Sequence, residues 1–370
     1  MSNRIYSNRR YLDAIADHVV IFDGAMGTSI QNYKLTAEDY GGEQYNGCVD
    51  YLVITRPDVI GEIHASFLAV GSEVVETNTF RSNRWTLAEY GLGDRTLEIN
   101  RAAAKLARSV CDRFEKETGI PRFVAGSIGP SGKLPSGDDP ELSNVTFDQL
   151  ADLFYEQAQG LVEGGADLLL VETSQDILEV KAAVYGINRY FEESGNRIPL
   201  QVQITLDVSG RMLFGTDIAG AMVTLEALPI DAIGMNCSTG PEYMRQPIQY
   251  LVERTRFPIS VLPNAGLPIN VDGEAVYPMT PEPFSEMVSE FTRWGVNIVG
   301  GCCGTRPEHL AQLYQKVNGY TYAEYLDALK TGKPLKRQSP KPRTPQHEPQ
   351  ASSGMTAMRM IQNPGPHTHR

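Results

Sequence analysis

The sequence predicts an α/β fold in which eight parallel strands and their helices form a (β/α)8 TIM barrel. Eight short apolar runs recur along the chain, and helical patterns lie between them. Alternation of strand and helix favours a parallel sheet with right-handed crossovers, and eight such units in about 300 residues fit a closed barrel. An open doubly wound sheet is the alternative. It is disfavoured because Gly24 is followed by AMGTS and not by a dinucleotide-binding GxGxxG sequence.

The strands are expected where Val, Ile and Leu cluster before a glycine or a polar residue. These runs are almost continuously apolar, as strands buried on both faces of a parallel sheet are. The eight predicted strands lie at 19–24, 72–80, 123–129, 167–173, 200–207, 232–238, 259–266 and 296–304.

The helical stretches between these runs carry start and stop signals. Pro57 suits the first turn of a helix over 57–71, which ends at Gly71. Asp94 is the expected cap of a longer helix that ends at Gly119. Two further helices are predicted at 146–165 and 307–317.

Length and charge exclude several classes of protein. The chain has 370 residues, of which 41% are apolar, and a net charge of −12. It is long enough for one large domain, and its acidic balance argues against a nucleic-acid partner. There is no run of 18 apolar residues that would suit a membrane span. Asp13 and Asp17 interrupt any N-terminal signal sequence, so we expect a cytoplasmic protein with reduced thiols.

The composition changes after residue 332. From Lys333 to Arg370 there are seven Lys and Arg, one acidic residue and seven of the 23 prolines. Such a segment cannot bury enough apolar surface to offset the entropy of ordering it. We therefore divide the chain into a barrel at 1–332 and a disordered, extended and solvated Pro-rich basic tail or linker at 333–370.

Polar residues at the ends of the predicted strands are the candidates for an active site, because a parallel barrel builds its site there. Asp23 and Glu172, at the ends of the first and fourth strands, form a suggestive pair. A buried carboxylate needs a partner, and a substrate ammonium group would be a suitable one. The full set of candidates is Asp23, Glu76, Thr77, Asn78, Ser127, Glu172, Thr173, Asp207, Asn236, Cys237, Asn264, Cys302 and Cys303.

Three of the five cysteines lie at the ends of the sixth and eighth strands. They are Cys237 and the adjacent pair Cys302 and Cys303, whereas Cys48 and Cys111 lie elsewhere. Adjacent side chains on a regular strand point to opposite faces, so both can reach one metal only if the glycines of GGCCG let the chain bend. Catalytic zinc takes three protein ligands and leaves a fourth position open. The pattern favours a three-thiolate zinc site, with a redox-active or nucleophilic cysteine and inert packing as alternatives.

Six segments at or near the predicted strand ends are distinctive. They are FDGAMGTSIQ (22–31), EVVETNTF (73–80), LLVETSQD (169–176), GMNCSTGPEYM (234–244), PNAGLP (263–268) and GGCCGTRPEHL (300–310). Together they resemble the homocysteine S-methyltransferase family. The resemblance runs from about residue 15 to residue 330, and it is nearest to the homocysteine-binding modules of cobalamin-dependent methionine synthases. Betaine-dependent members are the nearest alternative branch.

The resemblance implies a role for each matching residue. The zinc ligands would be Cys237, Cys302 and Cys303. The substrate residues would be Asp23 and Glu172 for the amino group of homocysteine, Gly24, Ala25 and Thr77 for its carboxylate, and Asn264 beside the zinc.

The activity that the resemblance implies is zinc-dependent methylation of the homocysteine thiol to give methionine. Methylcobalamin would be supplied by another domain or protein, with 5-methyltetrahydrofolate as the ultimate donor. The cobalamin-binding and folate-binding domains would be its partners, and they have no counterpart in these 370 residues. The alternatives are a betaine- or S-methylmethionine-dependent homocysteine methyltransferase and a non-catalytic zinc- and thiol-binding module. We expect no nucleic-acid and no membrane partner.

Overall fold

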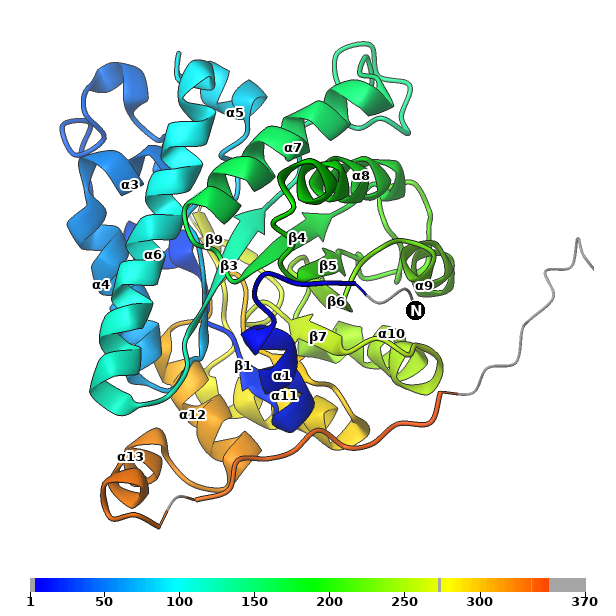
Figure 1. Ribbon diagram of the computed structural model, residues 1–370. Helices are drawn as coiled ribbons and strands as arrows, with labels where there is room; N and C mark the ends of the chain where they lie inside the picture. Colours follow the sequence, from blue (N-terminus) through cyan, green and yellow to red (C-terminus); the bar gives the residue numbers. More distant parts are fainter. Residues whose placement is uncertain (1–3, 272–273, 334, 346–370) are drawn as a thin grey trace, which may run out of the picture.

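Eight short strands alternate with helices along the chain and form one parallel sheet (Figure 1). The computed structural model describes residues 4–271, 274–333 and 335–345. Every one of the eight predicted apolar runs contains a strand. The strands are β1 (Val20–Ile21), β2 (Val74–Glu76), β3 (Phe123–Ile128), β4 (Leu168–Ser174), β5 (Leu200–Ile204), β6 (Ala232–Asn236), β7 (Ile259–Leu262) and β10 (Ile298–Val299).

The sheet closes on itself. Its strand order is β1-β10-β7-β6-β5-β4-β3-β2. The two outermost strands are joined because the Glu73 N–H donates to the Ile21 carbonyl at 2.7 Å and the Asp23 N–H donates to the Val74 carbonyl at 3.0 Å. The predicted barrel is therefore confirmed over the open sheet. The order also places β6 and β10 on either side of β7, so residues that follow β6 and β10 can converge.

Helices surround the barrel, and the predicted start and stop signals are mostly confirmed. Pro57 lies in the first turn of its helix, and Gly119 ends another in a left-handed conformation with φ of 70°. The predicted cap at Asp94 is wrong, because Asp94 lies in a 3₁₀ turn and Arg95 occupies the cap position. The helices are α1 (Arg10–Asp17), α2 (Met26–Gln31), α3 (Leu52–Thr55), α4 (Pro57–Ala69), α5 (Arg84–Ala88), α6 (Thr96–Thr118), α7 (Phe147–Glu163), α8 (Ile177–Ser194), α9 (Ile218–Glu226), α10 (Pro241–Arg254), α11 (Pro281–Trp294), α12 (Pro307–Asn318) and α13 (Tyr322–Lys330).

The inside of the barrel is filled mainly by apolar side chains, together with a few buried polar ones, and α1 covers its N-terminal end (Figure 1). Tyr11 of α1 lies edge-on to Phe22 and Phe123, with ring centroids 6.3 and 5.8 Å away. The same buried cluster includes Ile15 of α1 and Leu168 of β4. The side chains of this cluster therefore occupy the N-terminal half of the barrel interior.

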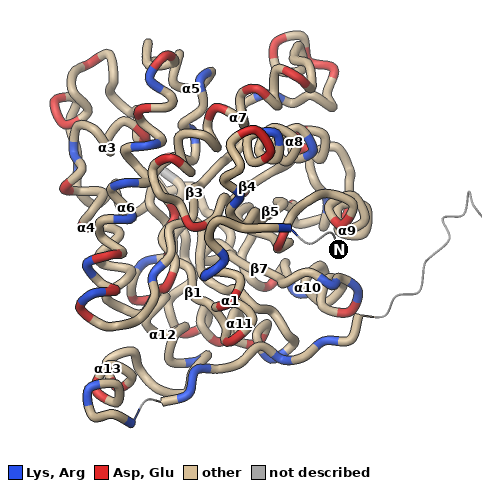
Figure 2. Tube along the Cα trace, viewed as in Figure 1, with Lys and Arg blue, Asp and Glu red and all other residues tan. Residues whose placement is uncertain are grey.

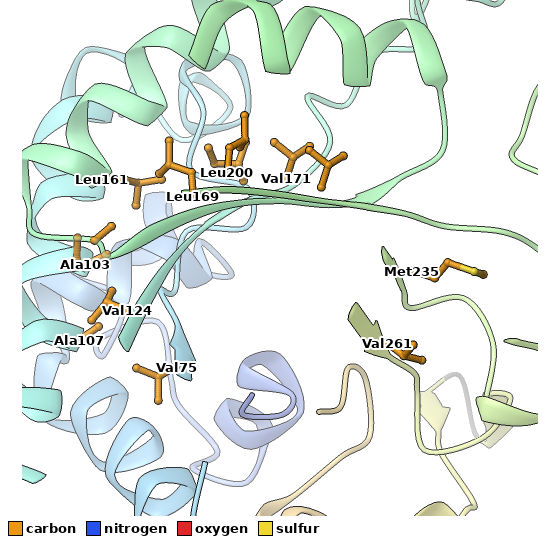
Figure 3. Close-up of a cluster of buried hydrophobic side chains, with 14 of the residues drawn as sticks. Val75, Ala103, Ala107, Val124, Leu161, Leu169, Val171, Leu200, Met235 and Val261 are labelled. Carbon is orange, nitrogen blue, oxygen red and sulfur yellow. The ribbon is translucent and has the colours of Figure 1, made fainter. Parts of the chain in front are cut away.

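The other face of the strands packs under the surrounding helices, as the period of two along a strand requires. Val124 of β3 and Leu169 of β4 belong to this outer cluster, together with Ala103 and Ala107 of α6 and Leu161 of α7 (Figure 3). The strands are thus buried on both faces, which explains their continuous apolar sequence.

A short hairpin follows β7 and was not predicted. It pairs β8 (Ile269–Val271) with β9 (Glu274–Val276) in antiparallel fashion. Each strand has only three residues, which is too short for an alternating pattern to identify it.

The C-terminal segment 335–345 runs along the N-terminal end of the barrel. It is extended, as predicted, but it is bound and not fully solvated. The Val19 N–H donates to the Gln338 carbonyl at 2.8 Å, and the Arg343 guanidinium donates to the Phe257 carbonyl at 2.6 Å. Figure 2 shows basic residues along this segment. Residue 334 and residues 346–370 of the predicted linker lie outside the described residues.

A buried ionic cluster holds this segment in place. Glu73, at the start of β2, is 2% exposed and accepts hydrogen bonds from His18 and Arg337. Burial alone would raise the pKa of Glu73, but the neighbouring His18 and Arg337 hold that pKa below its usual value. The cluster therefore joins the segment after α13 to the beginning of the barrel.

Within the described ranges, none of the helices is both long enough and apolar enough to cross a membrane.

Replacing Glu73 by Gln should lower the free energy of unfolding by about 3 kcal/mol at neutral pH, because Arg337 loses its buried carboxylate partner. The folded-state pKa of Glu73 lies below its usual 4.5. The contribution of Glu73 to the free energy of unfolding is therefore complete above pH 4.5 and is lost as the pH falls through the folded-state pKa. Urea unfolding of both proteins across this range measures the difference.

Glu98→Gln, at a surface pair with Arg95, is the control and should lower the free energy of unfolding by less than about 1 kcal/mol. Equal losses in the two variants would contradict a special role for Glu73.

Candidate metal and substrate site

Three cysteine sulfurs meet at the C-terminal end of the barrel. Cys237 follows β6, and Cys302 and Cys303 follow β10. The Cys303 Sγ lies 3.8 Å from that of Cys237 and 4.0 Å from that of Cys302, and all three lie within 4.8 Å of one another. Sulfurs that bind one tetrahedral zinc at the usual distance are about 3.8 Å apart. In the described part of the chain, no other group of three His, Cys, Asp or Glu side chains brings its ligand atoms so close together.

The backbone bends at these cysteines, as the GGCCG sequence predicts. Cys237 has a φ of +59° and Gly304 a φ of +77°, so both turn the chain away from a regular strand. Gly301 contributes in another way, through close packing. A Cβ at Gly301 would lie 2.4 Å from the Thr305 hydroxyl oxygen, so only glycine fits there.

The loop after β7 holds the cysteine loop from one side. The Cys302 N–H donates to the Pro263 carbonyl at 2.8 Å, and the Ala265 N–H donates to the Cys303 carbonyl at 2.9 Å. The Asn264 side-chain oxygen accepts from the Cys303 N–H at 3.1 Å. Asn264 therefore lies beside the sulfurs, at the place where the sequence predicts it.

The sulfurs share their protons unequally. Hydrogen bonds from the Cys237 and Cys302 thiols lower the pKa of Cys303 to about 3, although burial opposes this effect. The reciprocal interactions raise the pKa of Cys302. Proton sharing within the trio therefore favours ionisation of Cys303, and a cation bound between the sulfurs would favour ionisation of the other two as well.

Asp23 and Glu172 are buried at the same end of the barrel. Asp23 is 1% exposed, and its Oδ2 accepts from the Glu76 N–H at 3.0 Å, whereas its Oδ1 has no hydrogen-bond partner among the described residues. Glu172 is 4% exposed. Its two oxygens accept from the Ser127 hydroxyl at 2.6 Å and from the Asn236 amide at 2.9 Å. The Oδ1 atom of Asp23 is therefore available to a hydrogen-bond donor on a ligand.

A third carboxyl group, Glu76, shares this environment, although sequence reasoning assigned it no role. Burial raises the pKa of Asp23, Glu76 and Glu172, the last to about 7. The negative charge of Glu172 raises the pKa of the other two further. None of the three forms an ion pair with a Lys, Arg or His of the described chain. This end of the barrel is therefore short of positive charge.

The backbone around Gly24 and Ala25 is packed against Thr305. The Ala25 N–H already donates to the Thr305 carbonyl at 3.2 Å. The Gly24 N–H makes no hydrogen bond within the described residues. A Cβ at Gly24 would lie 2.5 Å from the Thr305 hydroxyl oxygen. Of the two predicted amides, Gly24 is thus the one left available to a ligand.

The Thr77 hydroxyl is engaged within the protein. It accepts from the Ser127 N–H at 3.0 Å and lies 2.6 Å from the Thr79 hydroxyl. Because Thr79 donates to the Ser127 carbonyl, the Thr77 hydroxyl donates to Thr79. In this arrangement Thr77 supports the end of β3.

Two other strand-end candidates lie outside this cluster of groups. Asp207 is exposed and accepts from the Ser209 N–H at 2.8 Å in a turn. Asn78 donates to the Val49 carbonyl at 2.8 Å and so holds the loop before α3. Position at a strand end is therefore not sufficient for a place in the site.

Tyr277 stands over the cysteine loop, and no signal in the sequence marks it. It follows β9, and its Cβ lies 2.2 Å from the position that a Cβ on Gly304 would take. Burial and the negative charge of Cys303 raise the pKa of the Tyr277 hydroxyl. The unpredicted hairpin thus delivers a side chain to the site.

Comparison with known proteins agrees with this geometry. The model of the family described as homocysteine S-methyltransferase matches residues 20–317, a range that contains all eight barrel strands and the three sulfurs. The chain belongs to the homocysteine S-methyltransferase family. The predicted resemblance is confirmed, and with it the assignment to a family of methyltransferases.

Two relatives within this family are methionine synthases of mycobacteria. The chain is 40% identical over 306 residues to the methionine synthase of Mycobacterium tuberculosis and 39% identical over 303 residues to that of Mycobacterium leprae. Each match covers 82% of this chain but only 25% and 24% of the relatives. The chain therefore spans about a quarter of the length of these relatives.

A solved structure has the same fold. The metallated form of the homocysteine methyltransferase MmuM from Escherichia coli superposes with a TM-score of 0.65 at 21% identity. The match covers 82% of this chain and 98% of that one. It supports the barrel independently of the strand order.

Gly304→Ala should lower the free energy of unfolding by about 2 kcal/mol or more, because the new methyl group meets both a left-handed backbone and Tyr277. Gly319 is a matched control, since it has a φ of +82° and nothing within 4 Å of an added Cβ. Gly319→Ala should cost only about 1 kcal/mol. Urea unfolding compares the two, and equal losses would show that Tyr277 does not press on the cysteine loop.

Proposed function

We propose that this chain is the zinc-dependent, homocysteine-binding module of a cobalamin-dependent methionine synthase. It would activate the homocysteine thiol for methyl transfer and so give methionine. The observation that carries the proposal is the meeting of three sulfurs with a cluster of carboxyl groups that has no cation of its own. Family membership and the 40% identity to a methionine synthase support it.

The chemistry of homocysteine suits the groups at the site. Its ammonium group is the cation that Asp23 and Glu172 lack among the described residues, and it can donate up to three hydrogen bonds to carboxylate oxygens. Its carboxylate suits the Gly24 N–H, with Ala25 and Thr77 nearby in supporting positions. Its thiol extends toward the sulfur trio. The substrate is thus bound at both ends.

The donor set of Cys237, Cys302 and Cys303 fits zinc. Three thiolates and one open position match a catalytic zinc site, and the separations of the sulfurs agree with its size. When bound, zinc holds the substrate thiol in its ionised form at neutral pH, where a free thiol is mostly protonated. Asn264 lies beside this position and holds the Cys303 amide.

The residues of the chain then orient the reaction. Asp23 and Glu172 fix the amino end of homocysteine, and this directs its sulfur toward the open end of the barrel. The sulfur forms the new bond to the methyl group while the bond between that methyl group and its donor breaks. We propose methylcobalamin, supplied by another domain or protein, as the donor and 5-methyltetrahydrofolate as the ultimate source.

The organisation of the chain follows from this role. We propose that residues 1–332 are the homocysteine-binding barrel and that residues 333–370 are a linker toward cobalamin-binding and folate-binding domains. The relatives are about four times as long as the matched region, which supports such partners. The five cysteines are all free in the structure, and we therefore propose a reducing, cytoplasmic location.

Metal analysis tests the zinc site. The purified chain should hold about one zinc, and Cys237→Ala should hold close to none, because two thiolates do not complete the site. Cys111→Ala is the matched control, since Cys111 is buried in α6 away from the trio, and it should keep its zinc. Zinc retained by Cys237→Ala, or absent from the parent protein, would contradict the proposal.

Methionine formation tests the reaction. The zinc-loaded chain with homocysteine and free methylcobalamin should form methionine, and Cys237→Ala should not. Betaine and S-methylmethionine are parallel arms of the same assay. If methionine forms with betaine or S-methylmethionine but not with methylcobalamin, the chain belongs to the branch that uses that donor, and the proposed cobalamin-dependent branch is wrong. Binding of homocysteine without methionine from any donor would identify a non-catalytic thiol-binding module.

A further inference from the structure

Asn236 connects the carboxylate side of the site with the sulfur side. It is the last residue of β6 and precedes Cys237, and it is 1% exposed. Its Nδ2 lies 2.9 Å from Glu172 Oε2 and 3.9 Å from Cys302 Sγ. The first contact is a hydrogen bond of normal length, and the second is a weaker contact to sulfur. One side chain thus touches both groups that the two ends of homocysteine would meet.

Asn236 also supports an irregular stretch of β4. The register between β4 and β5 shifts between Val171 and Ser174, and Thr173 has a φ of +55°. A β-branched residue is strained in this left-handed conformation and needs support from its surroundings. The Thr173 N–H donates to Asn236 Oδ1 at 2.7 Å, and Asn236 Nδ2 lies 2.9 Å from the Thr173 hydroxyl oxygen.

The bulge is where Glu172 leaves the strand. Bulges next to active sites redirect side chains, and here the redirected side chain is the buried carboxylate. Glu172 is then held at two points, by the Ser127 hydroxyl on one oxygen and by Asn236 on the other. Asn236 therefore fixes both the backbone that carries this carboxylate and one of its oxygens.

Only an amide satisfies these partners together. The Thr173 N–H needs an acceptor, and the Glu172 carboxylate needs a donor, which places Oδ1 toward the first and Nδ2 toward the second. A carboxylate at position 236 would repel Glu172. An aliphatic side chain there would leave the Thr173 N–H without its acceptor and would remove the amide donor to Glu172 Oε2.

We propose that Asn236 is a positioning residue that sets the distance between the ammonium-binding carboxylate and the sulfur trio. This inference rests on the proposed function. Asn236 acts through Glu172 and does not itself hold the ammonium group. Its effect should therefore depend on whether the ligand has an amino group.

Calorimetric titration of the zinc-loaded chain tests this with two ligands. L-homocysteine has the amino group, whereas 4-mercaptobutyrate has the same thiol and carboxylate without it. Asn236→Ala should raise the Kd of homocysteine by roughly tenfold or more, as loss of a hydrogen bond to a charged group does. The Kd of 4-mercaptobutyrate should change by no more than about twofold, because Glu172 has no ammonium group to hold. Zinc content should stay at about one per chain.

Two further variants separate positioning from a general loss of structure. Asn100 is a buried asparagine of α6 whose amide donates to the Ser82 and Thr96 carbonyls, so Asn100→Ala should reduce stability and leave both Kd values unchanged. In a chain that already carries Glu172→Gln, adding Asn236→Ala should not raise the Kd of homocysteine further. The reason is that Asn236 acts through the Glu172 carboxylate, which this chain lacks. If Asn236→Ala does not fold, Asn236→Ser is measured in the same way, since its hydroxyl is too short to reach Glu172.

The outcomes are distinct. Equal weakening of both ligands, or independent effects of the two substitutions in the double variant, would overturn the role of Asn236. A parent chain that binds neither zinc nor homocysteine would instead overturn the proposed function. A parent chain that binds the two ligands equally would show that the carboxylates do not recognise the amino group.

Discussion

Buried acidic groups without a protein cation are the constraint on which this site depends. Asp23, Glu76, Glu172 and Cys303 share one end of the barrel, and the described chain supplies no ion pair to the three carboxyl groups. An unpaired buried charge is costly, so these groups must take up protons or attract cations. The proposed zinc and the ammonium group of the proposed substrate would each answer part of this need. With both bound, the charges at this end of the barrel would be balanced.

The barrel makes this arrangement possible by holding the groups rigidly. The sulfurs come from strands on either side of β7, and the loop after β7 bonds to the cysteine loop through Pro263 and Ala265. Glycines at positions 301 and 304 bring backbone close to Thr305 and Tyr277, where a side chain would not fit. The close contacts and buried acidic groups at the C-terminal end of the barrel are destabilising. The buried apolar clusters, which include residues of α1 at the other end, stabilise the fold.

The sequence predicts whatever depends on local pattern and on barrel topology. Apolar runs identify all eight strands, and the rule that strand ends meet brings Cys237 to the other cysteines. The rest depends on contacts that no local pattern encodes. Asn236 contacts an irregular stretch of another strand, and Tyr277 follows a hairpin whose two strands have only three residues each. The Pro-rich composition after residue 332 gives no sign that Arg337 pairs with Glu73, 264 residues earlier.

The filled interior has a kinetic consequence for the proposed reaction. Tyr11, Phe22 and Phe123 pack inside the N-terminal half of the barrel, so in the described chain the sulfurs face the C-terminal end. Under the proposed function, both reactants would enter from that end. Homocysteine would lie deeper, with its ammonium group at Asp23 and Glu172, and the larger methyl donor would lie between it and solvent. Homocysteine would then bind before the donor, and methionine would leave after it.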